Sequence, residues 1–175
     1  MSYLLGLSGS LRAASTNTKL MRAAAASYGG AFQEGNLRLP LYDGDLEDAE
    51  GIPDSVQSLA DQIAGAQAVI ISTPEYNKGI SGVLKNALDW VSRTKGSPWS
   101  GKPVAIMSAA AGRAGGERAQ FDLRLCMVPF RTQILQGPEM LLAASGKAFD
   151  NDGALKDDFT QKILDELMGN LRALT

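Results

Sequence analysis

The sequence predicts an α/β fold in which one parallel β-sheet is covered by helices on both faces. Stretches typical of strands and of helices alternate five times along the chain, which is the pattern of β-α-β crossovers. The clearest strands are unbroken apolar runs, as expected when both faces of a strand are buried. The 175 residues, 45% of them hydrophobic, are enough for a substantial core, so we expect a single domain over residues 1–175.

The first half of the chain supplies three of the expected strands. The short apolar run Tyr3–Ser8 is the first strand, and the Ala-rich stretch Thr18–Tyr28 has apolar residues on one side, as a helix would. Asn36–Leu39 is a weak second strand, followed by an acidic stretch, residues 42–53, that we expect to be a solvated loop. Apolar residues at helical spacing predict a helix over Ser55–Ala64, and the β-branched run "AVIIST" predicts the third strand at Ala68–Thr73.

The second half repeats the alternation. A helix is expected over Val83–Ser92, a fourth strand over Pro103–Ala110, a helix over Glu117–Val128 and a fifth strand over Arg131–Leu135. The C-terminal helix, Asp157–Leu174, carries the apolar residues Phe159, Ile163, Leu167 and Leu171. Because crossovers of this kind are right-handed, five such units favour a flavodoxin-like three-layer sandwich with a five-stranded parallel sheet of order 2-1-3-4-5. A six-stranded dinucleotide-binding sheet would need a longer chain.

Composition argues against several classes of function. The net charge of -2 gives no electrostatic case for nucleic acid or a membrane surface as a partner, and no apolar run is long enough to span a bilayer. One cysteine excludes an internal disulfide, and the lack of histidine excludes a Ser-His-Asp triad or a His-containing metal site, so no metal is expected. An enzyme of this composition needs other side chains or a cofactor with its own chemistry. No targeting signal precedes the first strand, so we expect a cytoplasmic protein.

The strand order predicts where a ligand would bind. In an open α/β sheet the ligand lies beyond the carboxyl ends of the strands where the order reverses, here between the first and third strands. The loops there, "GSLRAASTN" and "PEYNKGISG", and the neighbouring "AAGRAGG" are the most Gly-rich and polar in the chain. In the first loop, Arg12 and a helix N-terminus would nearly balance the charge of a phosphate monoester. Hydrogen bonds to the phosphate would come from Ser10, Ser15, Thr16, Asn17 and Thr18.

Other phosphate-binding motifs are missing from the sequence. It has no G-x-x-x-x-G-K-[ST], no G-x-G-x-x-G after the first strand, and no cysteine before Arg12 to act as a phosphatase nucleophile. A mononucleotide site remains, as does a purely structural loop in which Ser15–Asn17 cap the helix. "PEYN", Pro74–Asn77, is either a proline-initiated turn or, beside a phosphate loop, the border of a site for a flat heteroaromatic ring.

Together, "GSLRAASTN", "PEYNKGISGVLKNALDW" and "GGERAQ" resemble the NADPH-dependent FMN reductase family, which includes flavodoxin-like quinone, azo-dye and chromate reductases. The similarity runs from Leu5 to about Leu142. It implies one FMN per subunit, NADPH or NADH as co-substrate, and small-molecule electron acceptors: quinones, azo compounds, metal oxyanions or free flavin. Because the flavin accepts the hydride at its N5 atom, no catalytic side chain is expected.

The resemblance also implies roles for individual residues. The FMN phosphate would be lined by Ser10, Arg12, Ser15, Thr16, Asn17 and Thr18. The isoalloxazine ring would be bordered by Pro74, Glu75, Tyr76 and Asn77, and reached from the fourth loop by Ser108 and Gly112. Glu75 would act through its backbone or through a contact across subunits. Many relatives have Ser-Pro-Gly-Gly after the serine of the fourth strand, whereas this chain has Ala110, Ala111, Gly112 and Arg113, which alters the contacts at that edge.

The helix Glu117–Val128 is apolar on two sides, although a helix that covers a sheet needs only one apolar stripe. Phe121, Leu125 and Val128 lie on one side, and Leu123 and Met127 on another. The second apolar stripe indicates a partner subunit, with Trp90 and Trp99 as anchors; burial by the subunit's own loops is the alternative. The family implies a homodimer or homotetramer. Two other functions stay open: a non-enzymatic electron carrier of the flavodoxin type, against which Arg12 and the small net charge argue, and a scaffold that has lost flavin.

Overall fold

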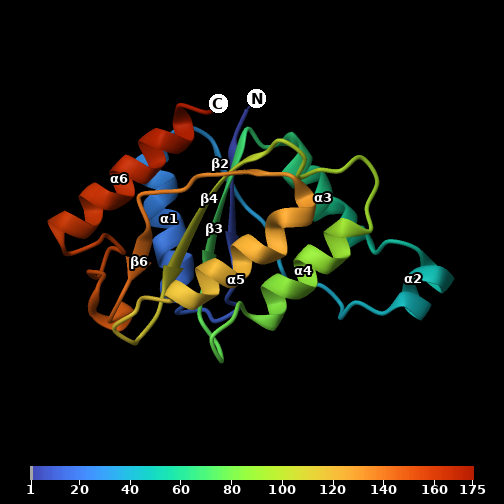
Figure 1. Cartoon of the computed structure of the whole chain (residues 1–175), viewed down its shortest axis with the longest axis horizontal. Coiled ribbons are helices and arrows are strands. Elements are labelled where there is room, and N and C mark those ends of the chain that lie inside the picture. The colour runs from blue at the N-terminus through green and yellow to red at the C-terminus, as the bar shows by residue number, and fades with distance from the viewer. Residues whose placement is uncertain (1) are drawn as a thin grey trace.

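The computed structural model describes residues 2–175, which form one β-sheet with helices packed against it (Figure 1). The strands are β1 (Leu4–Ser8), β2 (Phe32–Glu34), β3 (Ala68–Thr73), β4 (Pro103–Ala109), β5 (Gln133–Ile134) and β6 (Met140–Leu142). The helices are α1 (Thr16–Tyr28), α2 (Gly44–Glu50), α3 (Asp54–Gly65), α4 (Gly82–Ser92), α5 (Glu117–Met127) and α6 (Asp158–Arg172). All strand pairs are parallel and the order is β2-β1-β3-β4-β5, which confirms the predicted order.

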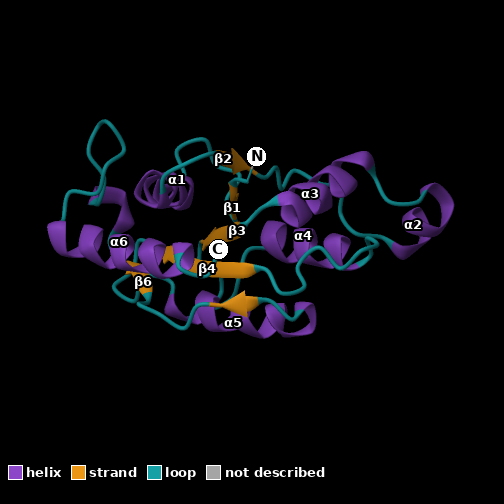
Figure 2. Cartoon of the chain, turned by 90° about the horizontal axis from the view of Figure 1, so that it is seen from above, coloured by secondary structure: helices purple, strands orange, loops and turns teal. Residues whose placement is uncertain are grey.

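Helices cover the sheet on both faces because successive strand residues point to opposite sides. Ile70 and Met107 belong to a core with α1 and α6, whereas Ile71 and Ile106 belong to a second core with α3, α4 and α5. Figure 2 shows these layers, with α1 and α6 on one side of the strands and α3 and α4 on the other. The predicted three-layer sandwich is confirmed. No helix among residues 2–175 combines the length and the apolarity needed to cross a membrane.

The second strand and the acidic stretch differ from the prediction. β2 lies four residues before the predicted Asn36–Leu39, and Phe32 pairs with Leu4 of β1. β2 is an edge strand with largely exposed side chains, so its sequence lacks the apolar signal of the inner strands. The acidic stretch is solvated as expected, but it contains α2, a helix with no buried residue. Because α2 has no apolar stripe, the spacing of apolar residues could not predict this helix.

The fifth position of the sheet is occupied by two short strands instead of the predicted Arg131–Leu135. β5 pairs with the start of β4, at Pro103 and Val104, and β6 pairs with its end, from Met107 to Ala109. The chain leaves the ladder between them in a segment that contains Pro138, and proline has no N–H to donate to a sheet. This division brings the loop after β6 to the carboxyl edge of the sheet.

The exposure of three aromatic side chains differs from the prediction: two are buried and one is exposed. Trp90 and Trp99 are buried within the chain, so their assignment as interface anchors is wrong. Trp90 donates its indole N–H to the carbonyl of Pro40 over 2.8 Å and stacks edge-on with Tyr42, while Trp99 lies in the core beside Phe130. Phe159 is 70% exposed, because α6 packs on the sheet through residues further along the helix: Leu164, Leu167, Met168 and Leu171.

Candidate functional site

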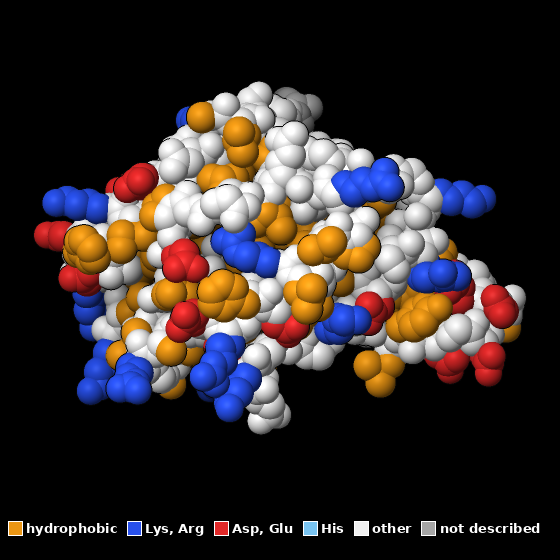
Figure 3. Space-filling model, in the orientation of Figure 1, with side chains coloured by type: hydrophobic (Ala, Val, Ile, Leu, Met, Phe, Trp, Pro, Cys, Tyr) orange, Lys and Arg blue, Asp and Glu red, His pale blue; other side chains and the backbone are white. Residues whose placement is uncertain are grey.

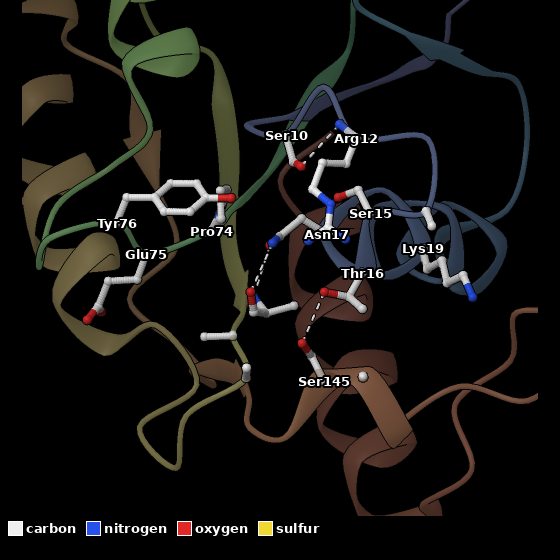
Figure 4. A pocket seen from close by; sticks show the side chains of 15 residues that line it. Ser10, Arg12, Ser15, Thr16, Asn17, Lys19, Pro74, Glu75, Tyr76 and Ser145 are labelled. Atoms are coloured by element: carbon white, nitrogen blue, oxygen red, sulfur yellow. Dashed lines mark hydrogen bonds between the residues drawn. The ribbon is translucent and has the colours of Figure 1, made fainter.

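A cavity of about 460 Å³ opens at the carboxyl ends of β1, β3 and β4, where the strand order reverses (Figure 4). This volume lies in the ordinary range for small-molecule sites. Its lining comes from the loops that follow β1, β3, β4 and β6 and from the start of α1. Eight of the twelve predicted site residues line it: Ser10, Arg12, Ser15, Thr16, Asn17, Pro74, Glu75 and Tyr76.

The N-terminus of α1 provides hydrogen-bond donors to this cavity. Ser15 is the N-cap residue, and its Oγ accepts a hydrogen bond of 3.2 Å from the backbone N–H of Thr18. The first helical bond of the backbone runs from Lys19 N–H to the Ser15 carbonyl. Within residues 2–175, the backbone N–H groups of Thr16 and Asn17 therefore have no acceptor. Both residues line the cavity, so these donors are available to an anion.

Arg12 adds a positive charge at the same place. Its side chain is exposed, and its guanidinium makes no ion pair or hydrogen bond with any described residue. The backbone N–H of Arg12 donates to Ser10 Oγ over 3.5 Å, a contact within the loop itself. Lys19, which the sequence reasoning did not include, is the fourth residue of α1 and lines the same cavity, with its ammonium 5.9 Å from the centre of the Phe149 ring. Arg12 is thus the cation that the site offers to an anion, and no carboxylate among residues 2–175 pairs with it.

Asn17 has a different role from the one expected of its side chain. It is buried, and its Oδ1 accepts hydrogen bonds of 2.9 Å from Ser72 Oγ and from the Ala109 N–H. Its Nδ2 donates to the Ala109 carbonyl, also over 2.9 Å. Figure 4 shows the amide turned toward the strands. The Asn17 side chain thus ties α1 to the ends of β3 and β4. Thr18 is similarly engaged, with its Oγ1 2.9 Å from Ser8 Oγ, and does not line the cavity.

The loop after β3 places an aromatic ring at the mouth of the cavity. Tyr76 is 55% exposed and lines the site together with Pro74. Tyr76 and Gly79 exchange backbone hydrogen bonds of 3.1 and 3.0 Å across a tight turn. Its central residues, Asn77 and Lys78, have φ values of 50° and 68°, the left-handed geometry of a type I′ turn. Asn77 is therefore at the tip of the turn and outside the cavity lining.

Glu75 stabilises a neighbouring helix of its own subunit. Its Oε2 accepts hydrogen bonds from the backbone N–H groups of Arg118 and Ala119, at 3.0 and 3.2 Å. These are the second and third residues of α5, whose N-cap residue, Gly116, has no side chain to accept these hydrogen bonds. The carboxylate thus caps α5 in place of a local residue and meets the positive end of its dipole. The sequence reasoning did not foresee this side-chain contact; the backbone role or contact across subunits that we predicted for Glu75 stays a prediction.

Neither Ser108 nor Gly112 lines the cavity, which on this side is formed by Ala109, Ala110 and Ala111; Gly112 is exposed in the loop after β4. Ser108 is fully buried; its Oγ donates to the Gly115 carbonyl over 2.7 Å and accepts from Gln120 Nε2 over 2.9 Å. Ser108 therefore anchors the loop after β4 to the buried end of the strand. Along that loop, the N–H groups of Ala111 and Gly112 have no acceptor in the described part of the chain.

The sequence reasoning missed the part of the site that follows β6. Ser145 and Gly146 line the cavity, and Ser145 Oγ lies 3.0 Å from Thr16 Oγ1, as Figure 4 shows. No motif marks these residues. They reach the site only because β6 pairs with the end of β4, a strand that was not predicted.

Comparison with known proteins agrees with this arrangement. The model of the NADPH-dependent FMN reductase family matches residues 3–147. An NAD(P)H-dependent FMN reductase of Pseudomonas aeruginosa is 39% identical over 97% of this chain and 92% of its own length. A quinone reductase of Escherichia coli K12 is 38% identical over 95% of this chain and 90% of its own. The structure of FerB, a flavoenzyme NAD(P)H:(acceptor) oxidoreductase from Paracoccus denitrificans, superimposes with a TM-score of 0.89 at 32% identity, covering 99% of this chain and 96% of that one. The resemblance inferred from the motifs is thus confirmed, and the chain belongs to the NADPH-dependent FMN reductase family of oxidoreductases.

Proposed function

We propose that the cavity holds one FMN, with its phosphate at residues 10–17 and its ring between Pro74–Tyr76 and Ala110–Gly112. The observation that carries this proposal is the convergence of one guanidinium and two helix N–H groups, all without a partner among residues 2–175, on one side of a cavity of about 460 Å³. A phosphate monoester needs this combination of cation and donors. When bound, FMN would supply the chemistry, taking a hydride from NADPH or NADH and passing two electrons to an acceptor.

The residues of the chain would then bind and orient the cofactor. Arg12 and the N–H groups of Thr16 and Asn17 would hold the phosphate, and Tyr76 would cover part of the ring. The free N–H groups of Ala111 and Gly112 would donate to the polar edge of the ring, where negative charge gathers on reduction. No side chain needs to act as a general base, which agrees with the absence of histidine.

Quinones are the acceptors we favour, because the Escherichia coli relative, similar over 95% of this chain, is a quinone reductase. Azo compounds, metal oxyanions and free flavin belong in the same test. We place the protein in the cytoplasm, where its single cysteine would stay reduced, and assign residues 1–175 to one FMN-binding domain. An electron carrier without reductase activity is not favoured by any contact in the site.

Two measurements test this proposal. The purified protein should be yellow, and flavin fluorescence should show tighter binding of FMN than of FAD, because the site has donors for one terminal phosphate. Steady-state turnover with NADPH and NADH against a panel of acceptors should then give the highest kcat/KM with a quinone. Equal or tighter binding of FAD, or no oxidation of either nicotinamide by FMN-loaded protein, would overturn the assignment.

We also propose that a second copy of the chain covers the exposed side of α5. Phe121 and Leu125 of α5 and Val128, in the 3-10 turn that follows it, are 57%, 70% and 70% exposed, and apolar side chains lie open over α5 in Figure 3. Leu125→Glu should shift the molar mass measured by light scattering toward that of a monomer. Phe159→Glu is the matched control, because Phe159 is also 70% exposed but lies on α6. A wild-type monomer, or the same shift in both variants, would contradict the proposal.

A further inference from the structure

A second hollow, of about 510 Å³, lies beside the candidate FMN site. The two share Ser10, Arg12 and Tyr76, so they meet along the first loop and the exposed aromatic ring. The remaining walls of the second hollow come from Gly9, Leu11, Arg38 and residues 81–83 at the start of α4. We propose that this groove binds a phosphate group of the nicotinamide dinucleotide, and that Arg38 is the residue that contacts it. This inference rests on the proposed function.

Arg38 is held in place but its charge is not neutralised. Its backbone N–H donates to Asn36 Oδ1 over 2.9 Å, which fixes the segment after β2. Its Nη2 donates to the Leu11 carbonyl over 3.1 Å, which aims the guanidinium at the first loop. That bond uses one of the five N–H groups of the guanidinium, and no carboxylate among residues 2–175 pairs with it. The side chain is therefore positioned and still able to bind an anion by two parallel hydrogen bonds.

The N-terminus of α4 adds partial positive charge to the groove, beside the guanidinium of Arg38. Ser81 caps α4, accepting from the Leu84 N–H at 3.2 Å while it donates to the Gly9 carbonyl at 2.6 Å. The N–H groups of Gly82 and Val83 have no acceptor in the described chain, and both residues line the groove. No Asp or Glu is among the lining residues. Acidic side chains gather instead over α2, at the right-hand end of Figure 3.

A phosphate of the co-substrate fits this groove better than a second part of FMN does. FMN has one phosphate, and Arg12 with the start of α1 would neutralise it. In this proposal the nicotinamide ring lies beside the exposed Tyr76, and the rest of the dinucleotide extends past Tyr76 and Ser10, which border the groove. The pyrophosphate is common to NADH and NADPH, whereas the 2′-phosphate is found only in NADPH. Arg38 could meet either group, since both have the same oxygen chemistry.

The test uses FMN-loaded protein and the oxidised nucleotides NADP⁺ and NAD⁺, which bind without reacting with oxidised flavin. Calorimetric titration should show that Arg38→Ala weakens binding of NADP⁺ by roughly tenfold, the lower end for a charge-assisted hydrogen bond because the site is exposed. Arg38→Lys should retain part of the affinity, since it keeps the charge without the planar fork. Arg131→Ala is the control; it removes the same charge before β5, at the opposite end of the sheet, and should change nothing.

The outcomes separate the alternatives. A loss for NADP⁺ alone assigns the 2′-phosphate to Arg38, and an equal loss for both nucleotides assigns the pyrophosphate; either supports the proposal. Unchanged binding of both nucleotides overturns it. An equal weakening of FMN binding also overturns it, because Arg38 would then act only by bracing Leu11 and the FMN loop. Wild-type protein that binds no FMN would instead refute the proposed function itself.

Discussion

Arg12 offers the sharpest test of the phosphate site. Its guanidinium is exposed and has no partner among residues 2–175, so the folded apo-protein gains little from it. With FMN bound, it would make a charge-assisted hydrogen bond, typically worth about 1.5–3 kcal/mol. Because the loop is open to water, we expect the lower value, which corresponds to roughly a tenfold loss of FMN affinity in Arg12→Ala. Riboflavin lacks the phosphate, so its affinity should not change.

The assay is a pair of fluorescence titrations, with FMN and with riboflavin, on wild type and variant. The midpoint of thermal unfolding of the apo-protein should stay unchanged, as is usual for exposed side chains without contacts. Lys19→Ala provides a comparison within the same cavity and should cost less, because Lys19 is a turn further along α1. Equal losses for FMN and riboflavin would refute the reasoning, since Arg12 would then shape the ring site or the fold.

Four further predictions concern two buried or capping contacts of the site, the ion pair of α2, and the kinetics. Asn17→Ala should destabilise the apo-protein by roughly 1–3 kcal/mol for each buried partner left unsatisfied, and an unchanged urea midpoint would contradict this role. Glu75→Ala should cost about 1 kcal/mol through the lost cap of α5, with a smaller loss in Glu75→Gln, both measured by urea unfolding. The guanidinium of Arg93, 2.9 Å from Glu47, holds the pKa of that carboxyl below its usual value. Their contact therefore stabilises the folded state fully above the ordinary carboxyl pKa of about 4.3, and this contribution is lost as the pH falls through the lowered pKa. Limited proteolysis with an acid-active protease should thus cut wild type near α2 faster as the pH falls through this range. At neutral pH, a protease active there should cut Arg93→Ala near α2 faster than wild type; equal rates for the two proteins would exclude the effect. Steady-state kinetics should be ping-pong, with parallel double-reciprocal lines, because we expect nicotinamide and acceptor to use one site in turn; intersecting lines would argue for separate sites.

The sequence alone determined the strand order and the place of the site. Apolar periodicity specifies which side of a regular element is buried, so the inner strands and the faces of α1, α3 and α4 were predictable. The strand order then brings the loops after β1, β3 and β4 together at one edge of the sheet. The motifs in those loops, with Arg12 and Tyr76, were sufficient to indicate the family.

Tertiary structure decided what each polar side chain in those loops does. A loop has no period, so nothing in "ASTN" shows that Asn17 turns toward the strands while Thr16 turns toward Ser145. The partner atoms decide it: the Ala109 backbone and Ser72 lie within reach of the Asn17 amide only after β3 and β4 have paired. Glu75 likewise caps α5, whose first N–H groups are more than forty residues away in the chain. Strands without an apolar pattern, β2 and β6, also depend on their neighbours, since their hydrogen bonds to β1 and β4 exist only in the assembled sheet.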